Sequence, residues 1–390
     1  MMVTTAKRRN FITAIAAVIV LGHWLVAPVA VADQRVVTIG FGGPITGLNA
    51  ANGVSMLNGA RMAVADLNNA GLSFKGDKLT FALLEQDDRS NPLIAELAAR
   101  YFVSRKVIGV VGIYNSNVAI SSSSIYQHAG IAHFATVGSQ KYTQQGHDTA
   151  FRLASYYEQR ANVLASFAVH ELHKTQVSIV HADSQFGIGY KDKFAAALVR
   201  EGGRVVSVES VSATSFDFSH ILSNLKTAQP EAVFFAGLGD QTPMFAKGMH
   251  HAGIDCPLIA AAVIVEPTFL VNAGEGAEMT VAIAPGLHQE MSKRFLNFER
   301  NYRQKYSAYP GPFSASVYDQ VQVLAAAFMQ ADSDDPHEIT KALHGINFKG
   351  LTGNISFDTR GELRELAFSM YQVQHGSWVL LKQYHFGAPQ

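Results

Sequence analysis

Polar side chains follow directly on an apolar stretch between residues 107 and 124. Residues 107–113 read V-I-G-V-V-G-I, which is typical of a strand buried on both faces of a parallel sheet. The short polar side chains of Asn115, Ser116 and Asn117 come next and favour the start of a helix. A helix N-terminus at the carboxyl edge of a sheet offers free N–H groups to an anion. The stretch therefore predicts a carboxylate site with the Ser116 hydroxyl as an added donor, although a capped helix without a ligand fits the same residues.

The sequence carries no recognisable catalytic or cofactor motif. It has no G-x-S-x-G elbow, no P-loop and no complete dinucleotide-binding glycine pattern. His170 and His173 have the spacing H-x-x-H, which differs from that of a zincin and fits a solvated or capping role better than metal binding. Asp87 and Asp88 are adjacent and fit a turn better than an acid–base pair. We therefore expect no catalysis, no metal and no cofactor.

The composition indicates a packed globular protein that is long enough for two domains. The chain has 390 residues, of which 48% are hydrophobic and 16% charged. Its 31 basic and 31 acidic residues balance, so nothing predicts a nucleic-acid partner. The single cysteine, Cys256, excludes an intrachain disulfide.

The first 32 residues have the pattern of a cleavable signal peptide. Residues 7–9 are basic, residues 11–29 are largely apolar, and A-V-A at 30–32 precedes Asp33. We expect cleavage after Ala32 and export to the periplasm. Residues 8–12 also approximate a twin-arginine signal, so the sequence does not decide between the Sec and the twin-arginine export routes. A permanent anchor is the alternative, but no cysteine stands there to carry a lipid, and no later apolar run is long enough to span a bilayer.

Strands and helices alternate along most of the mature chain, and a second alternating set begins near Phe151. This alternation predicts an α/β protein with two mostly parallel, doubly wound sheets. The strands expected in the two sets are 35–41, 79–84, 107–113 and 131–135, then 177–181, 205–211, 232–236 and 257–262. Two long helices are expected later, over 291–306 and 314–331, and a closing antiparallel pair is expected between 353–357 and 366–374.

The order and spacing of several motifs resemble the periplasmic leucine/isoleucine/valine-type solute-binding proteins of ABC importers. Each motif is weak alone, but together they cover nearly all of the mature chain. They are G-P-I-T-G at 43–47, N-G-A-R-M-A-V-A-D-L-N at 58–68, D-D-R-S-N-P at 87–92, G-I-Y-N-S-N at 112–117, D-S-Q-F-G-I-G at 183–189, A-G-E-G-A-E at 273–278 and I-S-F-D-T-R-G-E-L at 355–363.

The resemblance implies the type I periplasmic-binding fold. In that fold two Rossmann-like lobes, joined by a three-stranded hinge, close on a ligand. The crossovers would fall near Leu153, Pro285 and Gly350. Lobe 1 would then comprise residues 33–153 plus 286–349, and lobe 2 residues 154–285 plus 350–390.

The resemblance also implies a ligand-binding set drawn from both lobes. Asn115 and Ser116 fall on the loop that binds the ligand carboxylate, residues 136–139 on a second loop of lobe 1, and Phe186 on an aromatic position of lobe 2. The full expected set is Asn115, Ser116, Asn117, Thr136, Gly138, Ser139, Phe186, Leu238 and Ala262.

Three of these positions depart from the pattern of amino-acid binders. Gly138 stands where a threonine helps to hold the ligand, Leu238 replaces a pocket tyrosine, and Ala262 replaces the acid that takes the ligand ammonium. A buried ammonium without a partner is costly, so the missing acid favours an aromatic or aliphatic organic acid over a standard amino acid. Asp240 and Glu266 lie on nearby loops and are the candidates to replace that acid.

The sequence as a whole predicts a monomeric, exported binding protein that delivers a small carboxylate solute to an ABC permease. The alternative is a sensor of the same fold that presents its closed form to a receptor. An enzyme is disfavoured because no nucleophile, base and orienting residue come together in the sequence.

Overall fold

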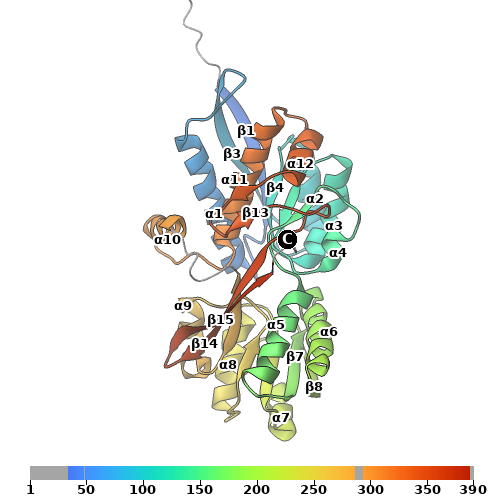
Figure 1. Ribbon diagram of the computed structural model, residues 1–390, viewed down its shortest axis with the longest axis vertical. Helices are drawn as coiled ribbons and strands as arrows, with labels where there is room; N and C mark the ends of the chain where they lie inside the picture. Colours follow the sequence, from blue (N-terminus) through green and yellow to red (C-terminus); the bar gives the residue numbers. More distant parts are fainter. Residues whose placement is uncertain (1–33, 48, 286–292, 387–390) are drawn as a thin grey trace, which may run out of the picture.

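The structure, a computed structural model, describes residues 34–47, 49–285 and 293–386. Two α/β lobes lie one above the other along the long axis of the molecule (Figure 1). Each lobe is built on its own sheet with helices on both faces, as the alternation of strands and helices predicts.

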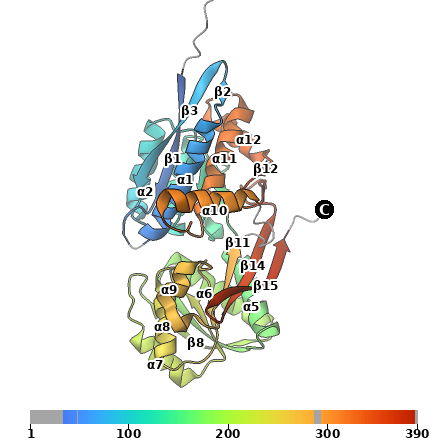
Figure 2. The ribbon, with the colours of Figure 1, turned by 90° about the vertical axis from the view of Figure 1, so that its left-hand side faces the viewer.

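The first lobe contains a six-stranded sheet whose neighbouring strands are parallel, except for β2 at one edge. In spatial order its strands are β2 (Ser73–Phe74), β3 (Asp77–Asp87), β1 (Gln34–Gly43), β4 (Val110–Ile113), β5 (His133–Ala135) and β6 (Ala150–Arg152). One face packs against α1 (Ala50–Asn69), α11 (Ser314–Ala331) and α12 (Pro336–His344), and the other against α2 (Pro92–Ser104) and α3 (Ser116–His128). The short helix α4 (Gln140–Thr143) follows β5, and α10 (Lys293–Tyr306) lies across the lobe next to α1 (Figure 2).

The second lobe contains a seven-stranded sheet with two antiparallel strands at one edge. In spatial order its strands are β15 (Ser377–Phe386), β14 (Leu366–Gln374), β11 (Val281–Pro285), β10 (Leu258–Ala260), β9 (Ala232–Ala236), β7 (Gln176–Ala182) and β8 (Arg204–Val211). Helices α5 (Tyr157–His170) and α6 (Gln185–Arg200) cover one face. Helices α7 (Ser219–Ala228), α8 (Gln241–His251) and α9 (Pro267–Ala273), with the short helix η1 (Gly274–Ala277), cover the other.

Local signals in the sequence predict several of these boundaries. Helix α2 begins at Pro92, and the Asn91 side chain accepts hydrogen bonds from the backbone N–H groups of Leu93 and Ile94, as its capping role requires. The turn role of the acidic pair is also confirmed. The Asp87 carboxylate accepts from the N–H of Ile45 at 2.9 Å and of Arg89 at 3.0 Å.

The expected antiparallel pairing of residues 353–357 with residues 366–374 is wrong. β13 (Asn354–Ile355) pairs with β12 (Phe348–Lys349), whereas β14 pairs with β11 and β15. β14 and β15 form a hairpin whose turn residues, His375 and Gly376, both have positive φ, 52° and 72°. Two-residue turns with this backbone match the twist of paired strands, so the chain returns on itself directly after β14.

The polypeptide passes between the lobes three times. The first passage joins β6 to α5, the second joins β11 to α10 through residues outside the described ones, and the third joins β13 to β14. Ile355 and Phe357 pack in the core of the first lobe. We therefore propose that the third boundary falls between Phe357 and Leu366, later than the expected residue 350, while the boundaries at 153 and 285 stay predictions.

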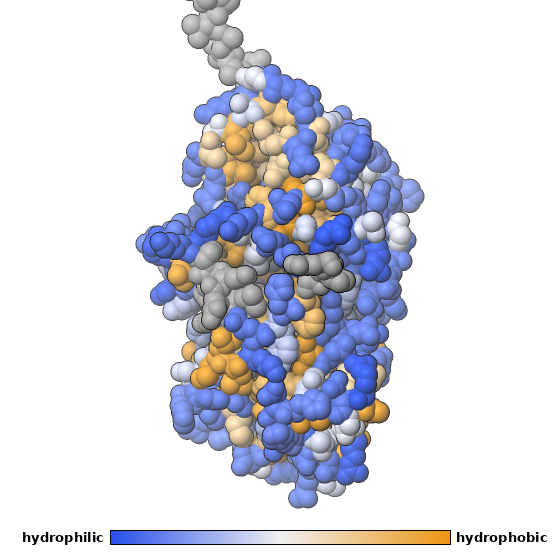
Figure 3. Space-filling model, viewed as in Figure 1, coloured by the Kyte–Doolittle hydropathy of each residue, from blue (hydrophilic) through white to orange (hydrophobic). Residues whose placement is uncertain are grey.

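On the face drawn in Figure 3 hydrophilic residues predominate, while apolar residues gather over the middle of the upper lobe and in smaller groups on the lower one. Within the described part of the chain, no helix combines the length and hydrophobicity that crossing a membrane requires.

Cys256 is half-buried beside β10, and burial raises the pKa of its thiol to about 11.

Candidate functional site

A cavity of about 90 Å³ lies where the carboxyl ends of the two sheets face each other, and both lobes line it. This is the edge at which open α/β sheets hold ligands, because the loops after parallel strands gather there. A wider hollow of about 580 Å³ lies on the second lobe beside α8 and η1, and none of the predicted site residues line it.

The structure brings most of the predicted residues together in the cavity wall. The predicted residues that line it are Asn115, Ser116, Thr136, Gly138, Phe186, Leu238 and Ala262. Asn117 is exposed and lies outside the lining. Ser139 is buried below the wall, where its carbonyl oxygen accepts a hydrogen bond from Arg152 Nη1 at 3.2 Å. The role of all nine residues in binding stays a prediction.

The wall of the first lobe contains the N-terminus of α3, which begins at Ser116 after the buried strand β4. Asn115 is the residue before the helix, yet its side chain makes no capping hydrogen bond. Its Oδ1 is buried and has no hydrogen-bond partner among the described residues. Buried polar atoms normally have partners, and this amide oxygen, as an acceptor, can take one only from a hydrogen-bond donor and not from a carboxylate.

Two carboxyl groups stand in the wall of the second lobe. Asp240 precedes α8 and Glu266 precedes α9, and both line the cavity. Burial raises the pKa of each carboxyl, and the charge of Asp240 raises that of Glu266 further. No lysine or arginine of the described chain forms an ion pair with either. The candidates to replace the missing acid at Ala262 therefore both face the same cavity.

Arg160 is the cation that lines this cavity within the described residues. Its guanidinium is buried and held by the wall itself, because Nε donates to the hydroxyl of Tyr190 and Nη2 donates to the carbonyl of Ala261 at 3.0 Å. Arg160 therefore stiffens the wall of the second lobe by joining α5 to α6 and to the end of β10.

Aromatic rings from both lobes supply the apolar part of the wall. Tyr114 and Phe313 meet edge to face in the first lobe, with ring centroids 5.8 Å apart. Phe186 and Tyr157 meet in the same way in the second lobe, 5.7 Å apart. Such pairs hold each other in place, so the cavity offers fixed apolar surfaces to the body of a ligand.

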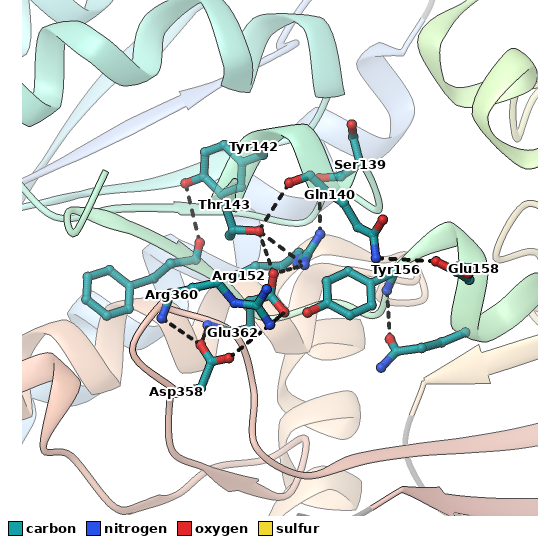
Figure 4. A network of polar contacts seen from close by, with 12 residues as sticks. Ser139, Gln140, Tyr142, Thr143, Arg152, Tyr156, Glu158, Asp358, Arg360 and Glu362 are labelled. Carbon is teal, nitrogen blue, oxygen red and sulfur yellow. Dashed lines mark hydrogen bonds and ion pairs between the residues drawn. The ribbon is translucent and has the colours of Figure 1, made fainter. Parts of the chain in front are cut away.

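The loop after β5 contacts a buried ion pair through the carbonyl oxygen of Ser139 (Figure 4). Arg152, wholly buried at the end of β6, contacts Glu362 with Nη2 and Oε1 2.8 Å apart. The guanidinium also lies 4.1 Å from the centre of the Tyr156 ring. Because Arg152 precedes the first passage and Glu362 lies on the third, the pair joins two of the three connections beneath the cavity.

Several lining residues escape prediction from the sequence. Tyr114 sits inside the G-I-Y-N-S-N stretch, so its place at the end of a buried strand is a usable signal. Tyr157, Arg160, Asn52 and Phe313 also line the cavity but belong to no motif that points to a ligand. No group of His, Cys, Asp and Glu suited to a metal ion occurs within the described ranges.

The chain is similar to known proteins of one family. Residues 36–377 match the family described as periplasmic binding protein. The Leu/Ile/Val-binding protein homolog 1 of Brucella melitensis is 29% identical over 351 residues, which cover 87% of this chain and 91% of the relative.

Solved structures show the same fold. The leucine-binding protein LivK of Thermotoga maritima superposes with a TM-score of 0.80 at 22% identity, covering 89% of this chain and 98% of its own. A solute-binding protein of an ABC transporter from Rhodopseudomonas palustris, in complex with 3,4-dihydroxybenzoic acid, has a TM-score of 0.79 at 19% identity and covers 90% of this chain and 97% of its own.

Proposed function

Because the chain belongs to the periplasmic binding protein family, we propose that it captures a small amino acid with an apolar side chain for an ABC importer. Members of this family are solute-binding proteins and not enzymes. The observation that carries the proposal is the placement of a helix N-terminus in one wall of the cavity and two carboxyl groups in the other.

Each wall contains groups that suit one charge of a zwitterion, and the Arg160 guanidinium in the second wall is already held by Tyr190 and the Ala261 carbonyl. The first N–H groups of α3 and the Ser116 hydroxyl suit a carboxylate. Asp240 and Glu266 suit an ammonium group, since an ionised carboxyl in a half-buried site is stabilised by a cation close to it. The missing acid at Ala262 favours an organic acid, but these two carboxyls in the lining reverse that preference.

The apolar part of the wall suits an aliphatic side chain. Tyr114, Phe313, Phe186 and Leu238 offer rings and methyl groups to the body of the ligand. The Leu/Ile/Val-binding name of the relative supports an aliphatic amino acid, and the dihydroxybenzoic acid held by a structural neighbour makes an aromatic acid the competing ligand class.

The proposal includes the setting in which the protein works. The basic and apolar pattern of residues 1–32 supports export by a cleavable signal peptide. We expect the mature protein to act in the periplasm as a monomer and to deliver its solute to a permease in the inner membrane.

Titration calorimetry with leucine, 4-methylpentanoic acid and 3,4-dihydroxybenzoic acid tests the ligand class. We expect the wild type to prefer leucine, because only leucine carries an ammonium group. Hydrogen bonds to charged groups contribute about 1.5–3 kcal/mol, so Asp240→Asn or Glu266→Gln should weaken leucine binding about ten- to a hundredfold.

Glu275→Gln is the matched control, because Glu275 is an exposed acid of the same lobe that lies away from the cavity. It should leave the affinity for leucine unchanged. Tighter binding of either amine-free acid than of leucine by the wild type would contradict the amino-acid proposal.

A further inference from the structure

We propose that Tyr157 is a ligand-positioning residue whose hydroxyl completes the carboxylate site from the opposite lobe. This inference rests on the proposed function, because it concerns the carboxylate half of the same cavity. Tyr157 is the first residue of α5, directly after the first passage between the lobes, and it lines the cavity.

The side chain of Tyr157 reaches across to the start of α3. Its hydroxyl oxygen lies 2.7 Å from Ser116 Oγ, and its backbone N–H donates to the carbonyl of Gly138 at 3.0 Å. Both partners belong to the first lobe, whereas α5 packs in the core of the second. Tyr157 therefore bridges the lobes: its helix packs in the second, and its hydroxyl and backbone N–H form hydrogen bonds with the first.

Two glycines form the slot that holds the ring. A Cβ atom at Gly138 would lie 2.4 Å from ring atom Cε1 of Tyr157, and one at Gly189 would lie 2.8 Å from Cδ2. Both distances are too short for real contacts, so neither position has room for a side chain while the ring is there. The ring thus occupies the space that a side chain at 138 would need, and it brings a hydroxyl into that part of the wall.

The hydrogen-bonding capacity of the two hydroxyls leaves one donor for a ligand. Ser116 and Tyr157 each have one O–H, and a single hydrogen bond between them uses only one of the two. Whichever hydroxyl donates, the O–H of the other stays available in the cavity wall. Burial raises the pKa of Tyr157 to about 12, so the phenol keeps its proton at neutral pH.

This arrangement ties the carboxylate site to the contact between the lobes. The α3 N–H groups belong to the first lobe alone, but the paired hydroxyls exist only where Tyr157 meets Ser116. A carboxylate that binds the pair gains a contact available only while the lobes are together. Such a ligand favours the closed arrangement through the extra interaction it makes there.

The variant Tyr157→Phe tests the inference, because it keeps the ring in its slot and removes only the hydroxyl. Tyr142→Phe is the matched control, since Tyr142 is a buried tyrosine of the first lobe that lies outside the lining and donates to the carbonyl of His133 at 2.8 Å. Calorimetry with leucine and with 4-methylpentanoic acid gives the affinities, and the melting temperature of the ligand-free protein reports the structural cost.

We expect Tyr157→Phe to weaken the binding of whichever probe the wild type binds by about ten- to a hundredfold, while Tyr142→Phe leaves affinity unchanged. The double variant with Ser116→Ala should lose less than the two single losses multiplied, because the hydroxyls act as a pair. Unchanged affinity in Tyr157→Phe, with a lowered melting temperature like that of the control, would show a purely structural role and overturn the inference.

The two probes distinguish a failure of this inference from a failure of the proposed function. Both carry the same carboxylate, so a preference for 4-methylpentanoic acid refutes the amino-acid ligand while the effect of Tyr157→Phe still supports the inference. A wild type that binds none of leucine, 4-methylpentanoic acid and 3,4-dihydroxybenzoic acid overturns both.

Discussion

At the scale of single residues, Asp240 and Glu266 determine how the proposed binding responds to pH. Burial raises the pKa of both carboxyls above their ordinary values of 3.8 and 4.5. Only an ionised carboxyl attracts an ammonium group, so affinity for leucine should be full above the raised pKa values. The affinity should fall as the pH drops through these raised pKa values. The loss should therefore begin at a higher pH than it would for carboxyls with ordinary pKa values.

Calorimetry with leucine from about pH 8 down to about pH 4 measures this dependence. Glu266→Gln should flatten the profile because it removes one titrating group, and 4-methylpentanoic acid, which has no ammonium group, should lose no affinity over the upper part of the range. A leucine affinity that stays constant until the ordinary carboxyl range would contradict the role given to these two residues.

The sequence predicts the place of a site residue when that place follows from the residues next to it in the chain. Asn115 and Ser116 follow a buried strand directly, so the sequence places them at the cavity edge. Tyr157 is separated from Gly138 by a whole strand and a change of lobe, and its ring meets Gly138 only after both lobes have folded. The residues next to Tyr157 in the sequence therefore do not predict that contact.

At the scale of elements, the buried ion pair between Arg152 and Glu362 joins the first and third connections. The backbone takes part as well, since the N–H of Arg152 donates to the carbonyl of Gly361 at 2.9 Å. Thr143 of α4 adds a hydrogen bond from its hydroxyl to the Glu362 carboxylate at 2.5 Å. Without Arg152, the buried Glu362 carboxylate would keep only the Thr143 hydroxyl and the exposed Arg360, 3.9 Å away, as partners among the described residues.

Arg152→Met should therefore lower the free energy of unfolding by about 3–5 kcal/mol, as is typical when one partner of a buried pair is lost. The double variant Arg152→Met/Glu362→Leu should lose less than the sum of the two single losses, because it leaves no buried charge. Urea unfolding followed by circular dichroism measures these changes.

Arg61→Met is the control for this series. Arg61 and Glu85 form a pair at 2.7 Å with 45% and 29% of their side chains exposed, and exposed pairs contribute about 0–1 kcal/mol. A loss in Arg152→Met no larger than that in Arg61→Met would show that the buried pair adds little to the hinge.

Elements with strong periodic patterns are predicted well, and those set by a backbone turn are not. Helix α11 spans Ser314–Ala331, as its apolar period predicts. β15 is missed because the turn at His375 and Gly376 lacks the Asn-Gly or Asp-Gly signal that normally marks a tight hairpin. The later position that we propose for the third lobe boundary is also hard to read from the sequence, since short strands such as β13 carry little pattern of their own.

At the scale of the whole molecule, two lobes with three connections should move as rigid bodies about the hinge. A ligand that contacts both walls of the cavity favours the closed arrangement by the contacts it makes only there. Small-angle scattering should therefore give a smaller radius of gyration at saturating leucine than without it. The same radius in both samples would argue against ligand-driven closure.

Export is the second property of the whole chain that can be tested. Processing after Ala32 should leave a mature protein that starts at Asp33. N-terminal sequencing of the protein from a periplasmic fraction checks this, and an intact leader in that fraction would rule the cleavage site out.

The chemistry of Cys256 makes this chain a convenient scaffold for an optical sensor. The thiolate is the form that reacts with maleimide dyes, and a half-buried thiol with a pKa of about 11 supplies very little of it at neutral pH. Leu93 on α2 and Val271 on α9 are 71% and 79% exposed, one on each lobe. Cysteines introduced at these two positions would take a donor and an acceptor dye ahead of Cys256, and energy transfer between the dyes would then report solute concentration directly.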